Sequence, residues 1–289
     1  MKNKELFKFK PMFNNFKNNF IIISLSILKN FRTYVYVFFI PLAFLMIYVW
    51  YTNATSGVFK PPRLFLYMIL PTFAIIFLVN TTVSEWKNSV FLKRIHSAGV
   101  SRLNFFVSLY VFNFIIGIVS FLMSLIVMSI ISLIYFNATN GSFFEIIGLW
   151  EFKDWIGIIY SLSLNISISI SIGVIISGLI NSIALSQTIT LIIVLFSIVF
   201  SDCLLPLDLM SVSKPLTIMS YFVPHKHSVW VGIIAASSEQ VKWAFENPER
   251  EGKMISFGFQ LWIPCLTAFF YSTLLITGGY FSFRWNNKR

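Results

Sequence analysis

Charged residues are scarce in this chain of 289 residues. Only 11% of them are Asp, Glu, Lys or Arg, whereas 57% are apolar and 18% are aromatic. Soluble proteins average about 25% charged residues, so this chain has too little polar surface for a soluble globular enzyme. The mean hydropathy of +0.78 also excludes an intrinsically disordered chain, because disorder requires low hydrophobicity. The composition indicates an integral membrane protein.

Residues that carry chemistry are equally few. The two cysteines, Cys203 and Cys265, cannot form a disulfide framework, although a single bridge between them stays open. The sequence contains no P-loop, HExxH, DDxxD or CxxC motif, so we expect no catalytic, cofactor or metal site in this chain. His225 and His227 could be two metal ligands, but no Cys or carboxylate stands beside them. A polar turn after Pro224 is the favoured interpretation.

Long intervals without charge define the expected fold. Five such intervals contain 27, 21, 42, 47 and 30 residues, and a membrane-spanning helix needs about 20. Turn residues end the apolar run of the third interval at Phe136, and a polar waist from Asn181 to Gln187 divides the fourth into a helical hairpin. The sequence therefore predicts an all-α polytopic membrane protein with six spans: 33–51, 64–83, 103–135, 156–180, 185–204 and 255–283.

The fourth expected span alternates serine with apolar residues from Ser163 to Ser171, which locally resembles a strand. A β-barrel would need many such segments, and the other intervals have none, so we expect a helix. On that helix the small residues form one wide face that lets a neighbouring helix approach closely. We favour helix packing over a substrate path for this face, whose members are Ser163, Ser167, Ser169, Ser171, Gly173, Ser177 and Asn181.

The distribution of Lys and Arg predicts the orientation. Six spans place both termini on one side, and that side would carry 14 basic and two acidic residues against eight basic and nine acidic residues on the other. The positive-inside rule therefore places both termini in the cytoplasm. The basic N-terminus, MKNKELFKFK, has no apolar segment close behind it, so we expect no cleaved signal peptide.

Three segments outside the spans have distinctive patterns. In residues 1–30, lysines alternate with phenylalanines, as in a helix that lies along the membrane surface. Residues 85–102 form a short cytoplasmic loop with an amphipathic helix. The outer segment 202–253 is only half polar, and within it Ser228–Glu246 suits a helix that dips partly into the outer leaflet.

The loop 85–102 carries a recognisable pattern. An acidic residue, Glu85, follows the second span, Phe91–Ile95 has the sequence Phe-Leu-Lys-Arg-Ile, and Val100–Arg102 has the sequence Val-Ser-Arg. The chain thereby resembles the permease subunits of ABC exporters of the ABC-2 type, which share an acidic residue, a pattern like Gly-Thr-Leu-Lys-Arg-Leu and then Pro-Val-Ser-Arg. Gly99 stands where the family usually has proline.

The resemblance extends over most of the chain. Residues 1–30 are similar to the connecting helix of the family, and the serine-rich fourth span is similar to its fourth. The segment after the fifth span is similar to the outer re-entrant helices that cap the pathway. The family usually has Ser-Gly before that segment, whereas Ser201 is followed here by Asp202.

The resemblance implies that a separate ATPase subunit, present in two copies, binds ATP and Mg²⁺ and contacts the loop between the second and third spans. A second copy of the permease, or a homologue, would complete the pathway in a bacterial plasma membrane. The residues it implies for ATPase coupling are Glu85, Trp86, Lys87, Phe91, Leu92, Lys93, Arg94, Ile95, His96 and Arg102. Those it implies for an outer gate are Pro206, Pro215, Pro224, Trp230 and Trp243.

The expected function is thus export of an amphiphile such as a drug, an antimicrobial peptide or a lipid-like molecule, with the bilayer and the ATPase as partners and no role for nucleic acid. Three alternatives stay open. They are export of a cell-wall polymer, a non-transporting immunity or sensor protein, and an enzyme acting on lipid-linked substrates. The last would depend on Asp202, Asp208 and the acidic group at 246–251, whose spacing matches no metal motif.

Overall fold

The computed structural model describes residues 3–56, 61–135, 143–204, 213–237 and 256–283. Within these ranges every regular element is a helix. Six helical segments are long and apolar enough to cross a membrane, which confirms the predicted number of spans. They are Phe31–Tyr51, Arg63–Asn88, Arg102–Leu133, Phe152–Leu179, Ile183–Phe200 and Trp262–Ser282.

Two of the spans consist of several helical pieces. The first joins α2 (Phe31–Tyr34), the π-helix η1 (Val35–Phe39) and α3 (Ile40–Ser56), and the second joins α4 (Pro61–Ile69), the 3₁₀ helix η2 (Leu70–Ala74) and α5 (Ile75–Asn88). Each irregular piece is associated with a proline that cannot donate a backbone hydrogen bond: Pro41 closely follows η1, and Pro71 lies within η2. The other four spans are α7 (Arg102–Tyr135), α9 (Phe152–Leu179), α10 (Ile183–Phe200) and α15 (Trp262–Ser282).

The ends of four spans differ by four residues or more from the predicted ones. The fourth begins at Phe152 rather than at residue 156. The second continues through Glu85 and Lys87 to Asn88, because Lys87 makes its polar contacts inside the protein. The fifth ends at Phe200 rather than at residue 204, and the sixth begins at Trp262 rather than at residue 255. The absence of charge identified the spans, but it does not report where the helical hydrogen bonds stop.

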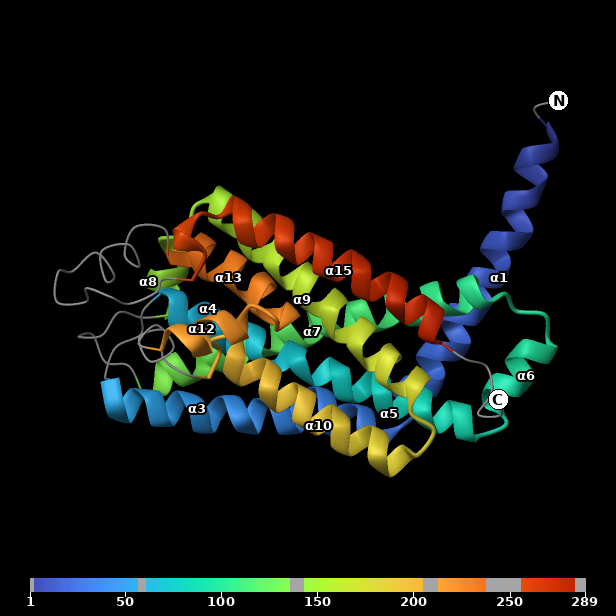
Figure 1. The fold of residues 1–289 in the computed structure, drawn as a ribbon, viewed down its shortest axis with the longest axis horizontal. Coiled ribbons are helices and arrows are strands. Elements are labelled where there is room, and N and C mark those ends of the chain that lie inside the picture. The colour runs from blue at the N-terminus through green and yellow to red at the C-terminus, as the bar shows by residue number, and fades with distance from the viewer. Residues whose placement is uncertain (1–2, 57–60, 136–142, 205–212, 238–255, 284–289) are drawn as a thin grey trace.

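Helix α1 (Asn3–Leu28) precedes the first span. Shorter helices connect the spans. They are α6 (Phe91–Ser97), α8 (Phe143–Gly148), α12 (Lys214–Ser220), α13 (Pro224–Ser237) and the 3₁₀ helix η4 (Ser256–Phe259). The start of α1, the end of α15 and α6 share one end of the bundle, whereas α8 and α12 lie at the other (Figure 1). This arrangement is the one that six antiparallel crossings require.

The second and fourth spans form the centre of the bundle. Their apolar segments are 89% and 72% buried, against 22–33% for the other four. Small residues of α9 make this contact possible: a Cβ added at Gly173 would lie 2.9 Å from the carbonyl oxygen of Ile76 in α5. The structure therefore agrees with helix packing as the role of the small-residue face.

Helix α13 is enclosed by the spans. It packs against α9, α15 and α4, and the ring of Phe65 in α4 occupies the space that a Cβ on Gly232 would need. The helix predicted over Ser228–Glu246 begins four residues earlier, at Pro224. Its side chains are buried within the protein on nearly every side, whereas the prediction had it dip into the outer leaflet. His225 and His227 lie in its first turn, so the predicted polar turn is wrong. The part of the predicted segment beyond Ser237 lies outside the described residues.

The N-terminal helix is present as expected, and the chain is helical from Asn3 to Leu28. The predicted alternation of lysine and phenylalanine falls mainly on residues whose side chains lie outside the described part. From Phe16 onward the helix packs on the bundle, with Ile23 and Ile27 buried and the rings of Phe20 and Phe112 5.9 Å apart. The second half of α1 is therefore attached to α7.

Candidate functional site

Helix α6 presents an exposed basic side at its end of the bundle. Lys93, Arg94 and His96 are exposed, whereas Leu92 is fully buried against the core. The Oγ of Ser89 accepts a hydrogen bond from the backbone N–H of Phe91 at 3.1 Å, which satisfies one free donor of the first turn. The apolar side of the helix thus attaches it, and the basic side faces outward.

Gly99 ends this helix in a left-handed conformation, with φ +78°. Such a residue after the last turn is a common way to stop a helix, and glycine adopts it without steric cost. Proline cannot adopt it, because its ring fixes φ near −65°. The departure from the Pro-Val-Ser-Arg pattern therefore has a conformational reason in this chain.

The residues before α6 hold it in place. The indole Nε1 of Trp86 donates to Ser26 Oγ of α1 at 3.1 Å, and its ring lies 4.8 Å from that of Phe91. Glu85 forms an ion pair with Arg32 at the start of the first span. Trp86 and Leu92, which the sequence pattern grouped with the contact residues, are therefore supports of α6 rather than part of its exposed surface.

Lys87 is buried, with 3% of its surface exposed. Its Nζ donates to the carbonyl oxygens of Ser177 at 2.9 Å, Gly178 at 3.3 Å and Ile180 at 3.2 Å. These carbonyls are the unsatisfied acceptors at the C-terminal end of α9, where the helix dipole also favours a positive charge. Lys87 thus joins the base of α6 to the turn between α9 and α10.

Arg102 plays the same role at the other side of α6. Its guanidinium donates to the carbonyl oxygens of Tyr280 and, at 2.9 Å, Phe281 near the end of α15. It also lies over the Tyr280 ring at 4.8 Å from the centroid, a cation–π contact. One basic residue on each side of α6, Lys87 before it and Arg102 after it, therefore connects it to the ends of two different spans.

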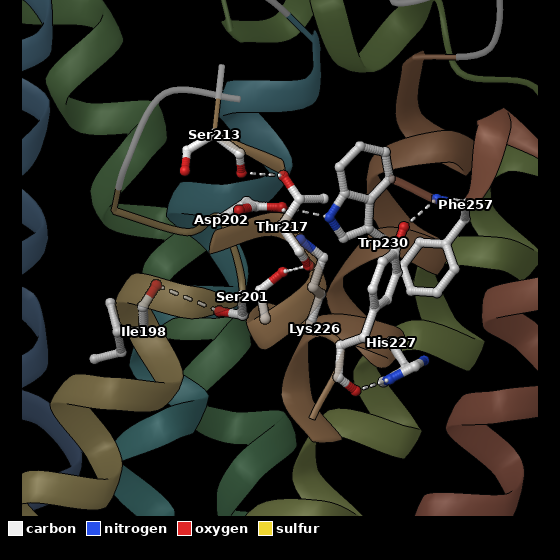
Figure 2. A network of polar contacts seen from close by, with 11 residues as sticks. Ile198, Ser201, Asp202, Ser213, Thr217, Lys226, His227, Trp230 and Phe257 are labelled. Atoms are coloured by element: carbon white, nitrogen blue, oxygen red, sulfur yellow. Dashed lines mark hydrogen bonds and ion pairs between the residues drawn. The ribbon is translucent and has the colours of Figure 1, made fainter. Parts of the chain in front are cut away.

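A buried polar network lies between the end of α10 and the first two turns of α13 (Figure 2). The Nζ of Lys226 in α13 lies 2.9 Å from Oδ2 of Asp202, which directly follows the C-cap of α10. The same oxygen accepts the indole N–H of Trp230 at 2.6 Å. Asp202 Oδ1 is buried with no hydrogen-bond partner among the described residues. The network connects α10 to α13 through one carboxylate.

The backbone of Asp202 is left-handed, with φ +64°, a conformation that favours glycine. Burial raises the pKa of Asp202 and lowers that of Lys226, and the ion pair opposes both shifts. We treat the pair as charged, because the carboxylate accepts two hydrogen bonds. The left-handed Asp202 is therefore held by two donors, the ammonium of Lys226 and the indole N–H of Trp230.

The histidines of α13 fasten it to its neighbours. His225 Nε2 lies 3.1 Å from Ser169 Oγ of α9, and burial lowers the pKa of His225 to about 3, so its ring is neutral. His227 Nε2 donates to the carbonyl oxygen of Tyr221 at 2.8 Å, because a carbonyl can only accept. Its Nδ1 then accepts from the Thr267 hydroxyl of α15 at 2.7 Å. No cluster of three metal-ligating residues occurs in the part of the chain that the structure describes.

The structure places the predicted gate residues in different parts of the molecule. Trp230 belongs to the buried network, Pro224 begins α13, and Pro215 is exposed in the first turn of α12. Pro206 and Trp243 lie outside the described residues. The sequence reasoning missed the pairing of Asp202 with Lys226, although a lysine and two histidines within an otherwise apolar helix were a usable signal.

A scan against models of known protein families finds no match to this chain, and a search of characterised proteins finds none either. The six apolar helices are those of a multi-pass membrane protein.

Proposed function

We propose that this chain is the membrane-spanning permease of an ATP-driven exporter similar to the ABC-2 type. The observation that carries the proposal is α6, a short helix between the second and third spans with an exposed basic side. It is fastened by buried contacts of Trp86, Lys87 and Leu92. A loop with no mechanical role would not need such anchoring.

In this function α6 is the part that a separate ATPase subunit displaces. The exposed Lys93 and Arg94 suit an acidic groove on that subunit, with α1 as a second contact. Two permease copies, or two homologues, enclose the pathway between them, and ATP with Mg²⁺ stays in the ATPase. The aromatic residues of the first, second and fifth spans suit an amphiphilic substrate. Both termini and α6 then lie in the cytoplasm of a bacterial cell, with α12 on the outer side.

The test reverses the charge of α6. The tagged chain is purified with its co-expressed ATPase, reconstituted in liposomes, and ATP hydrolysis is measured with and without permease. In the variant Lys93→Glu/Arg94→Glu we expect loss of the permease-dependent change in hydrolysis, since each lost charge-assisted contact costs about 1.5–3 kcal/mol.

The matched control is Lys153→Glu, which reverses an exposed charge at the far end of the bundle. Its ion pair with Glu151 is at the surface and is worth little, so hydrolysis should stay as in the wild type. Unchanged permease-dependent hydrolysis in the α6 double variant would refute the proposed function.

A further inference from the structure

Helix α10 packs against the rest of the protein along one side. Its buried residues, Ser186, Thr190, Val194, Ser197 and Ile198, recur every three or four positions. Large apolar residues such as Leu191, Ile192 and Leu195 on its other sides are exposed. Along this side α10 packs mainly against α5, and hydrogen bonds hold its two ends in addition.

The first end is held from the base of α6. Lys87 Nζ donates to the carbonyl oxygen of Ile180, which immediately precedes the turn into α10, and to those of Ser177 and Gly178. In the first turn of α10 itself, Ser186 Oγ donates to Asn80 Oδ1 of α5 at 2.6 Å. The helix that carries Lys87 into the loop therefore also fixes the start of α10.

The second end is held by α13. Asp202, two residues beyond the end of α10, accepts hydrogen bonds from Lys226 and Trp230. Tyr48 Oη of the first span donates to the carbonyl oxygen of Leu204 at 3.0 Å. The buried ion pair is the only one between two fully buried side chains in the described ranges.

We propose that Lys87 is a positioning residue that links α6 to α13 through α10. Helix α10 moves as a rigid element whose first end is held by Lys87 and whose second end is held by Lys226. A displacement of the α5–α6 junction moves the end of α9 and the start of α10 through Lys87. Because an 18-residue helix spans about 27 Å without bending, the displacement reaches Asp202 and pulls on Lys226. The use of this linkage in transport rests on the proposed function, but the linkage itself does not.

The two native cysteines provide the measurement. Cys203 is fully buried beside Asp202, whereas Cys265 is half-buried on α15. The purified permease, without any ATPase, is treated with a membrane-permeant maleimide, and the labelling rate of each cysteine is measured by peptide mass spectrometry. The ratio of the two rates separates movement at the end of α10 from general loosening of the fold.

The test variant is Lys87→Met, which keeps the length of the side chain but removes its donors. We expect the ratio of the Cys203 rate to the Cys265 rate to rise at least roughly tenfold, because losing even one of the three charge-assisted hydrogen bonds of Lys87 would shift an opening equilibrium by about that factor. Lys87→Arg, which retains charge and donors, should restore most of the protection. Lys93→Met is the matched control, because Lys93 is exposed on the same loop, and its ratio should equal that of the wild type.

Reciprocity gives a second measurement. If the two ends are coupled, Asp202→Asn should speed amide hydrogen exchange in the second turn of α10, residues 187–190, whose amides donate within the helix, as well as near residue 202. An unchanged ratio in Lys87→Met, an equal rise at both cysteines, or exchange in Asp202→Asn that changes only near residue 202 would each overturn the linkage. Loss of ATPase coupling in the α6 variants tests the proposed function separately, since the labelling needs no ATPase.

Discussion

Lys226 Nζ and Asp202 Oδ2 lie 2.9 Å apart, and their side chains are 0% and 1% exposed. Removing two charges from water costs several kcal/mol for each ion, and a buried pair recovers that cost only with good geometry and further hydrogen bonds. Here Trp230 supplies one further donor, while Asp202 Oδ1 has no partner in the described part. The pair therefore holds α10 against α13 but adds little net stability compared with apolar residues.

Removing one partner of this pair should be worse than removing both. Lys226→Met leaves a buried carboxylate, and Asp202→Gly leaves a buried ammonium, so we expect each to cost about 3–5 kcal/mol. Asp202→Gly/Lys226→Met should be more stable than either single variant, because it buries no charge and relieves the left-handed backbone at residue 202. Thermal unfolding midpoints in detergent test this order. A double variant less stable than both singles would contradict it.

Acid should destabilise the protein through His225. Its pKa falls from 6.5 in the unfolded chain to about 3 in the folded protein because of burial. The contribution is fully present above pH 6.5 and is lost as the pH falls toward about 3, with a slope near 1.4 kcal/mol per pH unit. His225→Gln, which can keep the contact to Ser169, should reduce the loss of thermal stability between pH 7 and pH 5. Burial also lowers the pKa of His227, so part of the acid effect should remain.

The end of α6 should tolerate asparagine but not proline. Gly99 has φ +78°, which asparagine adopts at modest cost and proline cannot. We expect Gly99→Pro to disrupt the last turn of α6 and to speed tryptic cleavage after Lys93 and Arg94. Gly99→Asn is the control and should be cleaved as slowly as the wild type. Equal cleavage of the two variants would show that this turn does not depend on the left-handed residue.

The orientation can be checked with single cysteines in a variant where Cys203 and Cys265 are replaced by serine. Ser97 in α6 and Leu149 directly after α8 are both exposed, and α6 and α8 lie at opposite ends of the bundle (Figure 1). With an impermeant maleimide added to intact cells, we expect labelling of Leu149→Cys and no labelling of Ser97→Cys. After the cells are permeabilised, both should react. Labelling of Ser97→Cys in intact cells would reverse the orientation and remove α6 from the cytoplasm.

The spans could be predicted because the cost of placing a charge in a membrane is visible in the sequence itself. The exact ends of the spans and the roles of individual charged residues could not be predicted in this way. Lys87 belongs by pattern to a contact loop, but it satisfies carbonyls about 90 residues further on in the chain. Asp202 and Lys226 are 24 positions apart, and no local period relates them. The contacts of Lys87 arise from the packing of α5 against α9, and the pairing of Asp202 with Lys226 arises from the way α13 is enclosed by α9, α15 and α4. Both depend on tertiary packing.

The left-handed backbone at Asp202 has a consequence for how related sequences can diverge. Starting from glycine at residue 202 and an apolar residue at 226, an aspartate at 202 is acceptable only when residue 226 becomes basic at the same time. Returning to glycine likewise requires residue 226 to become apolar again. Intermediates with only one of the two changes would be eliminated by their low stability. Residues 202 and 226 should therefore be inherited as a matched pair, either acidic with basic or glycine with apolar. That covariation could be sought in genome sequences before any protein is purified.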